Sequence, residues 1–448
     1  MGSRVFFYMR FCPTPLRFIR CVRFVVTGFS LSVLSGFAAE AGNDPALGFP
    51  SISVARGQAG HEIRFQGILQ SAQTIPGTWT EVTGAVSPYR LEPTEVPRFY
   101  RAMESGSVFS GGSVLELALR GPFQEYFDLA FAGIPDGIFP PVRSKPYFDG
   151  ILQMANLELP VQIRVRGNSS LQECSFPKLK FKVARKDREG TPFADAREVK
   201  VGTHCAEGGQ GNIGRLRHET AAFREAAAYD TMTLIGFIGP RVRKARIHYQ
   251  DSTGVAGSGD TGWEITRMAL LLDGVEVVAE RLNGRALEDE EVAALKNAGF
   301  DEQLVADLQL FNTLIGNWDY ALSLDGQGLW NTEVIELSDG KLVPVAGDFD
   351  LASWVTGKVL VTGPRDYLPE LDDLVRQTRF RLSEIRLAVG DSRFGLAAAR
   401  FLTHREAIEL LIASAEIDPE GRENAMRHVD VFFEALSEVQ VHGVDGLP

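Results

Sequence analysis

The chain has 448 residues and a formal net charge of −12, with 44% hydrophobic and 23% charged residues. This composition excludes a wholly disordered chain, a collagen and a coiled coil, and the length predicts two or three globular domains. Because affinity for nucleic acid depends on clustered Lys and Arg, the acidic balance also argues against a nucleic-acid partner.

The N-terminus predicts an export signal over residues 1–41. Residues 1–23 contain five Arg and no acid, and residues 24–37 form an uncharged, mostly apolar run before a small-x-small sequence at 39–41. This order is typical of a secretory signal peptide. Two alternatives stay open, namely a start at Met9 and an uncleaved anchor. We expect an exported bacterial protein (secreted, periplasmic or in the cell envelope) with no membrane span after cleavage.

Residues 47–104 predict a small all-β, sandwich-like module. Its strands are expected at 62–69, 78–82 and 98–101, separated by Pro and Gly. Residues 105–113 are rich in Gly and Ser and predict a flexible linker.

Residues 114–448 predict an α+β domain that becomes mainly helical toward its end. Its strands are expected at 159–166, 177–183, 197–201, 243–249 and 267–272, and its helices at 218–235, 304–315 and within 378–448. Only Cys174 and Cys205 remain once the signal is removed. Two cysteines in an exported chain suit a disulfide, although the sequence leaves their state open, and no ligand pattern predicts a cysteine-based zinc site.

The residues that suggest a catalytic site follow the predicted helix at 304–315. Asp319 lies in a polar loop, Asn331 begins a hairpin, and Asp348 and Asp350 follow its second strand. Kinase catalytic loops use the same order, in which one Asp orients the acceptor hydroxyl while an Asn and a second Asp hold the metal. We therefore predict Asp319 as the catalytic residue and the other three as ligands of Mg²⁺ or Mn²⁺, with ATP as the phosphoryl donor. Taken singly, each residue also suits an ordinary loop or turn.

The turn at 167–170 predicts a phosphate-binding loop, with Asn168 and Ser169 contacting ATP. A lysine paired to a helix glutamate is expected beside it. Strand order favours Lys200 as this lysine, whereas the basic cluster beside the turn favours Lys180, and the sequence does not choose.

The expected glutamate partner is Glu225, with Glu219 as its rival. The lysines at 178, 180 and 182 alternate with apolar residues, so they are also compatible with an amphipathic edge strand that has one solvated face.

Several segments together resemble the spore-coat protein H (CotH) kinase family: residues 164–170, 176–181, 224–229, 314–319 and 345–350, with Asn331. The resemblance implies an atypical protein-kinase-like, two-lobed fold, with an N-lobe over about 114–275 and a C-lobe over about 276–448. It further implies phosphorylation of Ser or Thr on exported proteins, with Asp319 as acid/base, Asp348 as principal metal ligand and Asn331 as second ligand. Asp273 stands where the family carries Glu in its adenine-contact segment. The alternative is a catalytically inactive scaffold or binding protein of the cell envelope.

Overall fold

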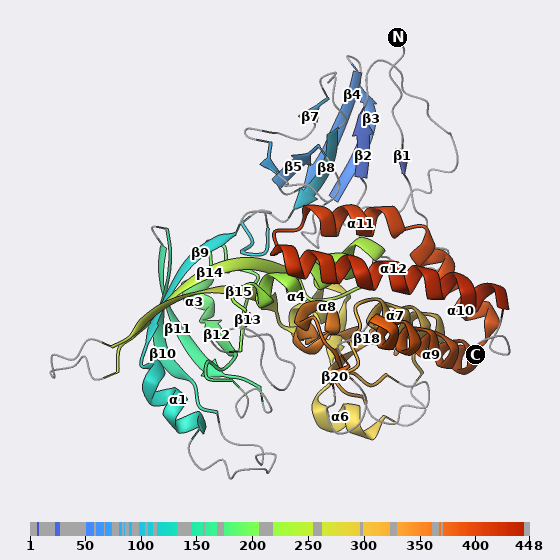
Figure 1. The fold of residues 1–448 in the computed structure, drawn as a ribbon. Helices are drawn as coiled ribbons and strands as arrows, with labels where there is room; N and C mark the ends of the chain where they lie inside the picture. The colour runs from blue at the N-terminus through green and yellow to red at the C-terminus, as the bar shows by residue number, and fades with distance from the viewer. Residues whose placement is uncertain are drawn as a thin grey trace. The chain divides into compact units, whose positions relative to one another are not determined.

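The computed structural model shows two compact units, Met1–Ser113 and Val114–Pro448 (Figure 1). Their boundary falls at the end of the predicted linker. Asn168, Ser169 and most of the predicted signal lie outside the described residues. The structure describes residues 7–8, 23–26, 51–57, 60–66, 68–73, 80–82, 85, 89–91, 98–103, 106–110, 114–131, 145–155, 157–167, 174–205, 218–253, 262–295, 299–322, 329–360, 367–368 and 371–442.

The first unit contains two antiparallel sheets. Ile63, Leu69 and Tyr100 pack together, and because these residues come from both sheets, one small core joins the two. The predicted strand at 62–69 is divided between β4 and β5. One sheet consists of β1 (Phe7–Tyr8), β2 (Arg23–Val26), β8 (Arg98–Met103), β5 (Ile68–Ala72) and β6 (Thr80–Glu81), and the other of β3 (Ser51–Gly57), β4 (Gly60–Gln66) and β7 (Tyr89–Arg90).

Two features of this unit bear on the sequence predictions. Strands β1 and β2 belong to the predicted signal, so cleavage after residue 41 would remove both from their sheet. Within the predicted flexible linker, Val108 and Phe109 are buried. The Gly and Ser content of this segment predicted flexibility, but its two apolar side chains gain more from burial than from exposure to water.

The second unit begins with a closed barrel in the order β10-β11-β12-β13-β15-β14-β9. Its pairs are antiparallel except for β14 with β9, which is parallel. Alternating apolar residues point inward, as in β12, where positions 179, 181 and 183 are buried. The strands are β9 (Leu115–Gly121), β10 (Phe148–Met154), β11 (Leu157–Val165), β12 (Leu179–Val183), β13 (Glu198–Thr203), β14 (Val242–Asp251) and β15 (Glu264–Asp273), and the helices among them are α1 (Phe123–Phe131), α3 (Arg185–Arg188) and α4 (Ala221–Ile235).

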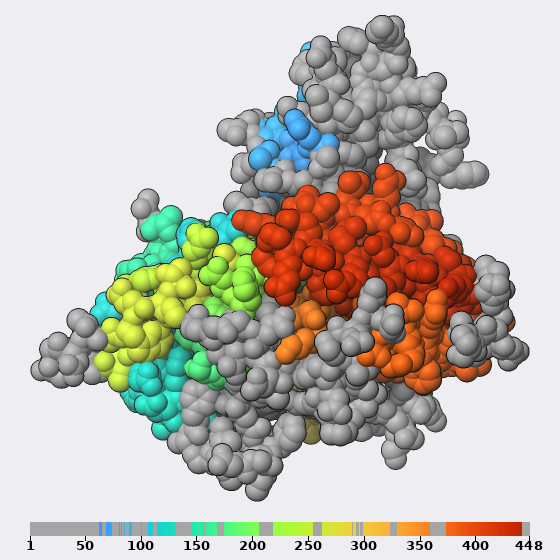
Figure 2. Space-filling model, in the orientation of Figure 1, coloured from blue at the N-terminus to red at the C-terminus, as the bar shows by residue number. Residues whose placement is uncertain are grey.

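The rest of this unit is mainly helical, and Figure 2 shows the C-terminal helices as a continuous surface beside the barrel strands. None of the described helices is long and apolar enough to cross a membrane. The elements are α5 (Val275–Arg281), β16 (Gly284–Ala286), α6 (Asp289–Ala294), α7 (Glu302–Leu314), β17 (Thr332–Leu337), β18 (Leu342–Ala346), the 3₁₀ helix η2 (Phe349–Leu351), α8 (Ser353–Thr356), β19 (Val359–Leu360), β20 (Tyr367–Leu368), α9 (Leu371–Val389), α10 (Asp391–Leu402), α11 (Arg405–Ser414) and α12 (Pro419–His442).

Helix α4 joins the barrel to the helical part. It is buried on nearly all sides, and its alanines share one core with β15, α7 and α12. A helix buried all round needs no polar face, which explains why its sequence lacks strong amphipathic periodicity. Helix α4 ends at Gly236, whose φ of 93° is the left-handed conformation of a helix C-terminal cap. Because α4 lies between the barrel and the C-terminal helices, several of its polar residues are also buried between them.

Candidate active site

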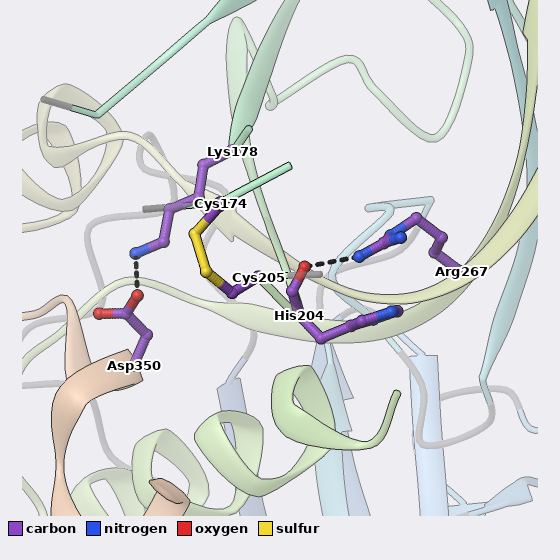
Figure 3. The surroundings of a disulfide bond; sticks show 6 residues. All are labelled: Cys174, Lys178, His204, Cys205, Arg267 and Asp350. Atoms are coloured by element: carbon purple, nitrogen blue, oxygen red, sulfur yellow. Dashed lines mark hydrogen bonds and ion pairs between the residues drawn. A yellow bond between two sulfur atoms is a disulfide. The ribbon is translucent and has the colours of Figure 1, made fainter. Parts of the chain in front are cut away.

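A buried lysine connects the barrel to the helical part. Lys178 lies directly before β12, and its Nζ is 2.5 Å from Oδ1 of Asp348 and 2.9 Å from Oδ2 of Asp350. Figure 3 shows Lys178 and Asp350 pointing toward one another. Burial lowers the pKa of Lys178, but the two aspartates outweigh this effect and raise the pKa above its ordinary value. Lys178 therefore stays charged at neutral pH.

The two aspartates are positioned by the phenylalanine between them. Phe349 is fully buried, and its ring centroid lies 4.5 Å from that of Tyr229 on α4. The hydroxyl of Tyr229 accepts a hydrogen bond from the backbone N–H of Asp348 at 3.0 Å. Asp348 has a φ of 56°, a left-handed conformation that costs about 1 kcal/mol for a residue other than Gly. The Phe349 anchor and the Tyr229 hydrogen bond hold Asp348 in this conformation.

Glu225 of α4 is buried beside the same cluster. Together with Lys178 and Asp350 it lines a cavity of about 20 Å³, which is large enough for one water molecule. Burial raises the pKa of Glu225 to about 8; Lys178 opposes this shift, while Asp350 and Asp348 add to it. The carboxyl group is therefore mostly protonated at neutral pH. Glu219, the rival candidate, is exposed and precedes the first residue of α4.

Asp319 and Asn331 contact one another directly. The Nδ2 of Asn331 donates to the backbone oxygen of Asp319 at 2.6 Å and to its Oδ2 at 3.2 Å. The backbone N–H of Asp319 donates to Oδ1 of Asn317, a fully buried residue just after α7. Asn331 has a φ of 50°, so both Asn331 and Asp348 are left-handed residues of the candidate site. Such conformations cluster at functional sites, where the surrounding structure holds them.

The β17–β18 hairpin places these residues near one another. Thr332 pairs with Ala346, and the backbone N–H of Gly347 donates to the oxygen of Asn331 at 3.3 Å. Asn331 is thus next to the chain segment that leads into Asp348. The structure brings Asp319, Asn331 and the Asp348–Asp350 segment to one end of the hairpin, where Lys178 reaches the two aspartates from the barrel.

The two lysines favoured by the sequence have other partners. Lys180 Nζ is 2.6 Å from Glu198 on the neighbouring strand β13, and Lys200 Nζ is 3.4 Å from Glu333 on β17. Sequence reasoning therefore missed Lys178 as the lysine of the aspartate cluster. The feature of the sequence that could have identified Lys178 is its place in the same alternating series as Lys180.

A disulfide braces the segment that carries Lys178 (Figure 3). Cys174 is bonded to Cys205, and the backbone N–H of Phe176 donates to the oxygen of Cys205 at 3.3 Å. Buried Arg267 donates from Nη2 to the oxygen of His204 at 2.6 Å, and its guanidinium lies 4.3 Å from the centroid of the Phe176 ring. Both cysteines also line the cavity beside Lys178. The disulfide thereby ties the start of β12 to the end of β13.

Arg166 is a second cation that sequence reasoning did not single out. Its backbone N–H donates to the oxygen of Lys178 at 2.8 Å, and its buried Nε has no hydrogen-bond partner in the described part of the chain. Its charge lowers the pKa values of both Lys178 and Glu225. Arg166 leads directly into the predicted phosphate-binding turn.

Asp273, at the predicted adenine-contact segment, is buried against an arginine. Arg241 donates from Nε to Oδ2 of Asp273 at 2.8 Å and from its backbone N–H to Oδ1 at 2.6 Å. Burial raises the pKa of Asp273, while Arg281 and Arg241 oppose the rise. In this structure the side chain of Asp273, the last residue of β15, is taken up by Arg241, which lies directly before β14.

The chemistry of the cluster suits a cation. Asp348 and Asp350 already share the ammonium of Lys178, and Asn331 uses its N–H groups for Asp319, which leaves its amide oxygen as a possible ligand. Carboxylate and amide oxygens are the ligands preferred by Mg²⁺. Within the described residues, no group of three or more His, Cys, Asp or Glu side chains is arranged to hold a metal. Two carboxylates and an amide fit an ion that keeps several waters and also binds substrate phosphates.

Comparison with protein-family models and with curated proteins finds no match to this chain.

Proposed function

We propose that this chain is an exported protein kinase that transfers the γ-phosphoryl group of ATP to a Ser or Thr hydroxyl of an exported protein. The proposal rests on one observation. Lys178 forms ion pairs with Asp348 and Asp350, next to the hydrogen-bonded residues Asp319 and Asn331. The barrel with α4 would form the N-lobe, over about 114–275, and the helical part the C-lobe, over about 276–448. This arrangement is the one implied by the resemblance to the CotH kinase family.

Each residue has a role in this proposal. Asp348, Asp350 and Asn331 would hold Mg²⁺ or Mn²⁺, which when bound neutralises charge on the phosphate oxygens. Lys178 would bind phosphate oxygens through its ammonium, taking the role first assigned to Lys180 or Lys200. Asp319 would orient the acceptor hydroxyl and accept its proton at the carboxylate. Catalysis would consist mainly of positioning and charge stabilisation.

Two further groups complete the proposed ATP site. The turn at 167–170, with Asn168 and Ser169, would contribute backbone N–H groups to the phosphates. Glu225 would orient Lys178 from α4, because both side chains line the same small cavity.

The disulfide supports an exported location. The Cys174–Cys205 bond would persist in an oxidising compartment and not in a reducing cytoplasm. This fits the signal-like composition of residues 1–41.

The purified chain, incubated with labelled ATP, Mg²⁺ or Mn²⁺ and generic protein acceptors, tests the proposal. We expect phosphate incorporation by the wild type and none by Asp319→Ala. The matched control is Asp339→Ala, which removes an exposed aspartate from the turn at the other end of the same hairpin and should keep full activity. Equal labelling by wild type and Asp319→Ala would refute the role of Asp319.

Nucleotide binding is tested separately by thermal shift with ATP and Mg²⁺, since a ligand that binds the folded state raises the melting temperature. Lys178→Met should abolish the shift, whereas Lys180→Met should preserve it, because Lys180 is paired with Glu198. A wild type that shows no shift, and no binding by calorimetry, would favour the inactive scaffold.

A further inference from the structure

A basic groove lies on the barrel, apart from the lysine–aspartate cluster. It has a volume of about 1170 Å³ and is formed by β9, β10, β11, β12 and α3. Lys178 precedes the first residue of β12, whereas Val183 and Ala184 in the groove lie at its far end. Five residues of strand span about 17 Å, so the groove and the proposed ATP site are separate.

The charge of the groove is opposite to that of the whole chain. Its lining includes six cationic and two anionic side chains, in a chain whose net charge is −12. Lys182 is paired with Glu198 at 3.3 Å, but the other five cations form no ion pair with any residue that the structure describes. The six cations are Arg120, Lys182, Arg185, Lys186, Arg188 and Arg197.

The segment between β12 and β13 carries four of these cations on a backbone that is held by local packing. Phe193 in this segment is fully buried, and its ring packs edge-on against Phe181 of β12 with centroids 6.0 Å apart. Thr191 adds two local hydrogen bonds, to the oxygen of Arg188 at 2.7 Å and from the backbone N–H of Phe193 at 3.2 Å. This packing holds the backbone of the segment in place, so a ligand that binds here orders the cationic side chains and not the backbone.

The floor of the groove is apolar. The outward-facing side chains of Ile151 and Pro160, which pair across β10 and β11, form it, and no aromatic side chain is among the described residues that line the groove. Single-stranded nucleic acids bind largely by stacking their bases on aromatic side chains, so this lining does not favour them. The volume also exceeds that of most small-molecule sites.

We infer that this groove binds a short acidic polypeptide segment in which acidic and apolar side chains alternate. Acidic side chains on one face of an extended segment meet the cations of the rim, and apolar side chains on the other face cover the floor. This binding does not depend on phosphoryl transfer, because the groove shares no residue with the lysine–aspartate cluster.

The test is fluorescence anisotropy with the full chain and three labelled probes: a peptide of alternating Glu and Val, a peptide of equal charge made of Glu and Ser, and an oligothymidylate. We expect the Glu/Val peptide to bind tightest, with an affinity that falls as salt is raised. The double variant Arg185→Gln/Arg188→Gln should weaken its binding about ten-fold.

The matched control is Arg285→Gln/Lys341→Gln, which removes the same charge from exposed residues of β16 and of the β17–β18 turn and should bind like the wild type. Equal melting temperatures for the three proteins would show that the substitutions leave the fold intact. Equal affinity of the wild type and the groove variant would overturn the inference. So would oligothymidylate or Glu/Ser binding as tight as that of the Glu/Val peptide, because the site would then recognise charge alone.

Discussion

Replacing Glu225 with Gln should stabilise the protein in a pH-dependent manner. Glu225 is 5% exposed, and burial raises its pKa from the ordinary value of 4.5 to about 8. The folded chain therefore keeps a proton that the unfolded chain releases. Stability contributed by this proton is complete below about pH 4.5, declines as the pH rises, and is lost above about pH 8. Glutamine resembles the protonated carboxyl group at every pH and avoids this loss.

The magnitude follows from the two pKa values. A rise from 4.5 to about 8 corresponds to about 5 kcal/mol of unfolding free energy. We expect Glu225→Gln and wild type to be equally stable near pH 4.5 and the variant to be more stable by about 3 to 5 kcal/mol near pH 9. Chemical denaturation of both proteins across this pH range measures the difference.

Glu219→Gln is the matched control, because Glu219 is exposed and lies only six positions before Glu225. Its stability profile should run parallel to that of the wild type at every pH. If Glu225→Gln also ran parallel, or became less stable than the wild type at high pH, the reasoning about a buried, protonated Glu225 would be refuted.

Two other contacts give predictions about stability. Cys174→Ser should lower the unfolding free energy by about 3 to 4 kcal/mol, measured by chemical denaturation without reductant, because the wild-type bond to Cys205 closes a loop over a sequence separation of 31. A wild type whose melting temperature did not fall when reductant was added would contradict this. The guanidinium of Arg224 is fully buried and lies 2.5 Å from Oδ1 of Asp418. Asp418→Asn removes its charge partner and should lower the unfolding free energy, measured by thermal denaturation, by about 3 to 5 kcal/mol. A loss below about 1 kcal/mol would show that the pair contributes little.

Several elements of the second unit could be read from the sequence. Apolar residues at helical spacing predicted α7, and alternation predicted β11, β12 and β14, because local periodicity reports which face of an element is buried. The order of Asp319, Asn331 and Asp348 along one loop and hairpin also follows from local sequence, since a hairpin brings the residues at its two ends together.

Only the tertiary structure distinguished among residues with the same local pattern. Lys178 and Lys180 share one alternating series, yet Lys180 forms an ion pair with Glu198 on the neighbouring strand β13. Lys178, just before the strand, reaches Asp348, which lies 170 positions away in the sequence. Glu225 differs from Glu219 because α4 is enclosed by the barrel and the helices. Neither periodicity nor spacing encodes such long-range contacts, because they depend on how strands align and how separate elements pack. The same reason explains why the sequence left the Cys174–Cys205 bond open and the structure decided it.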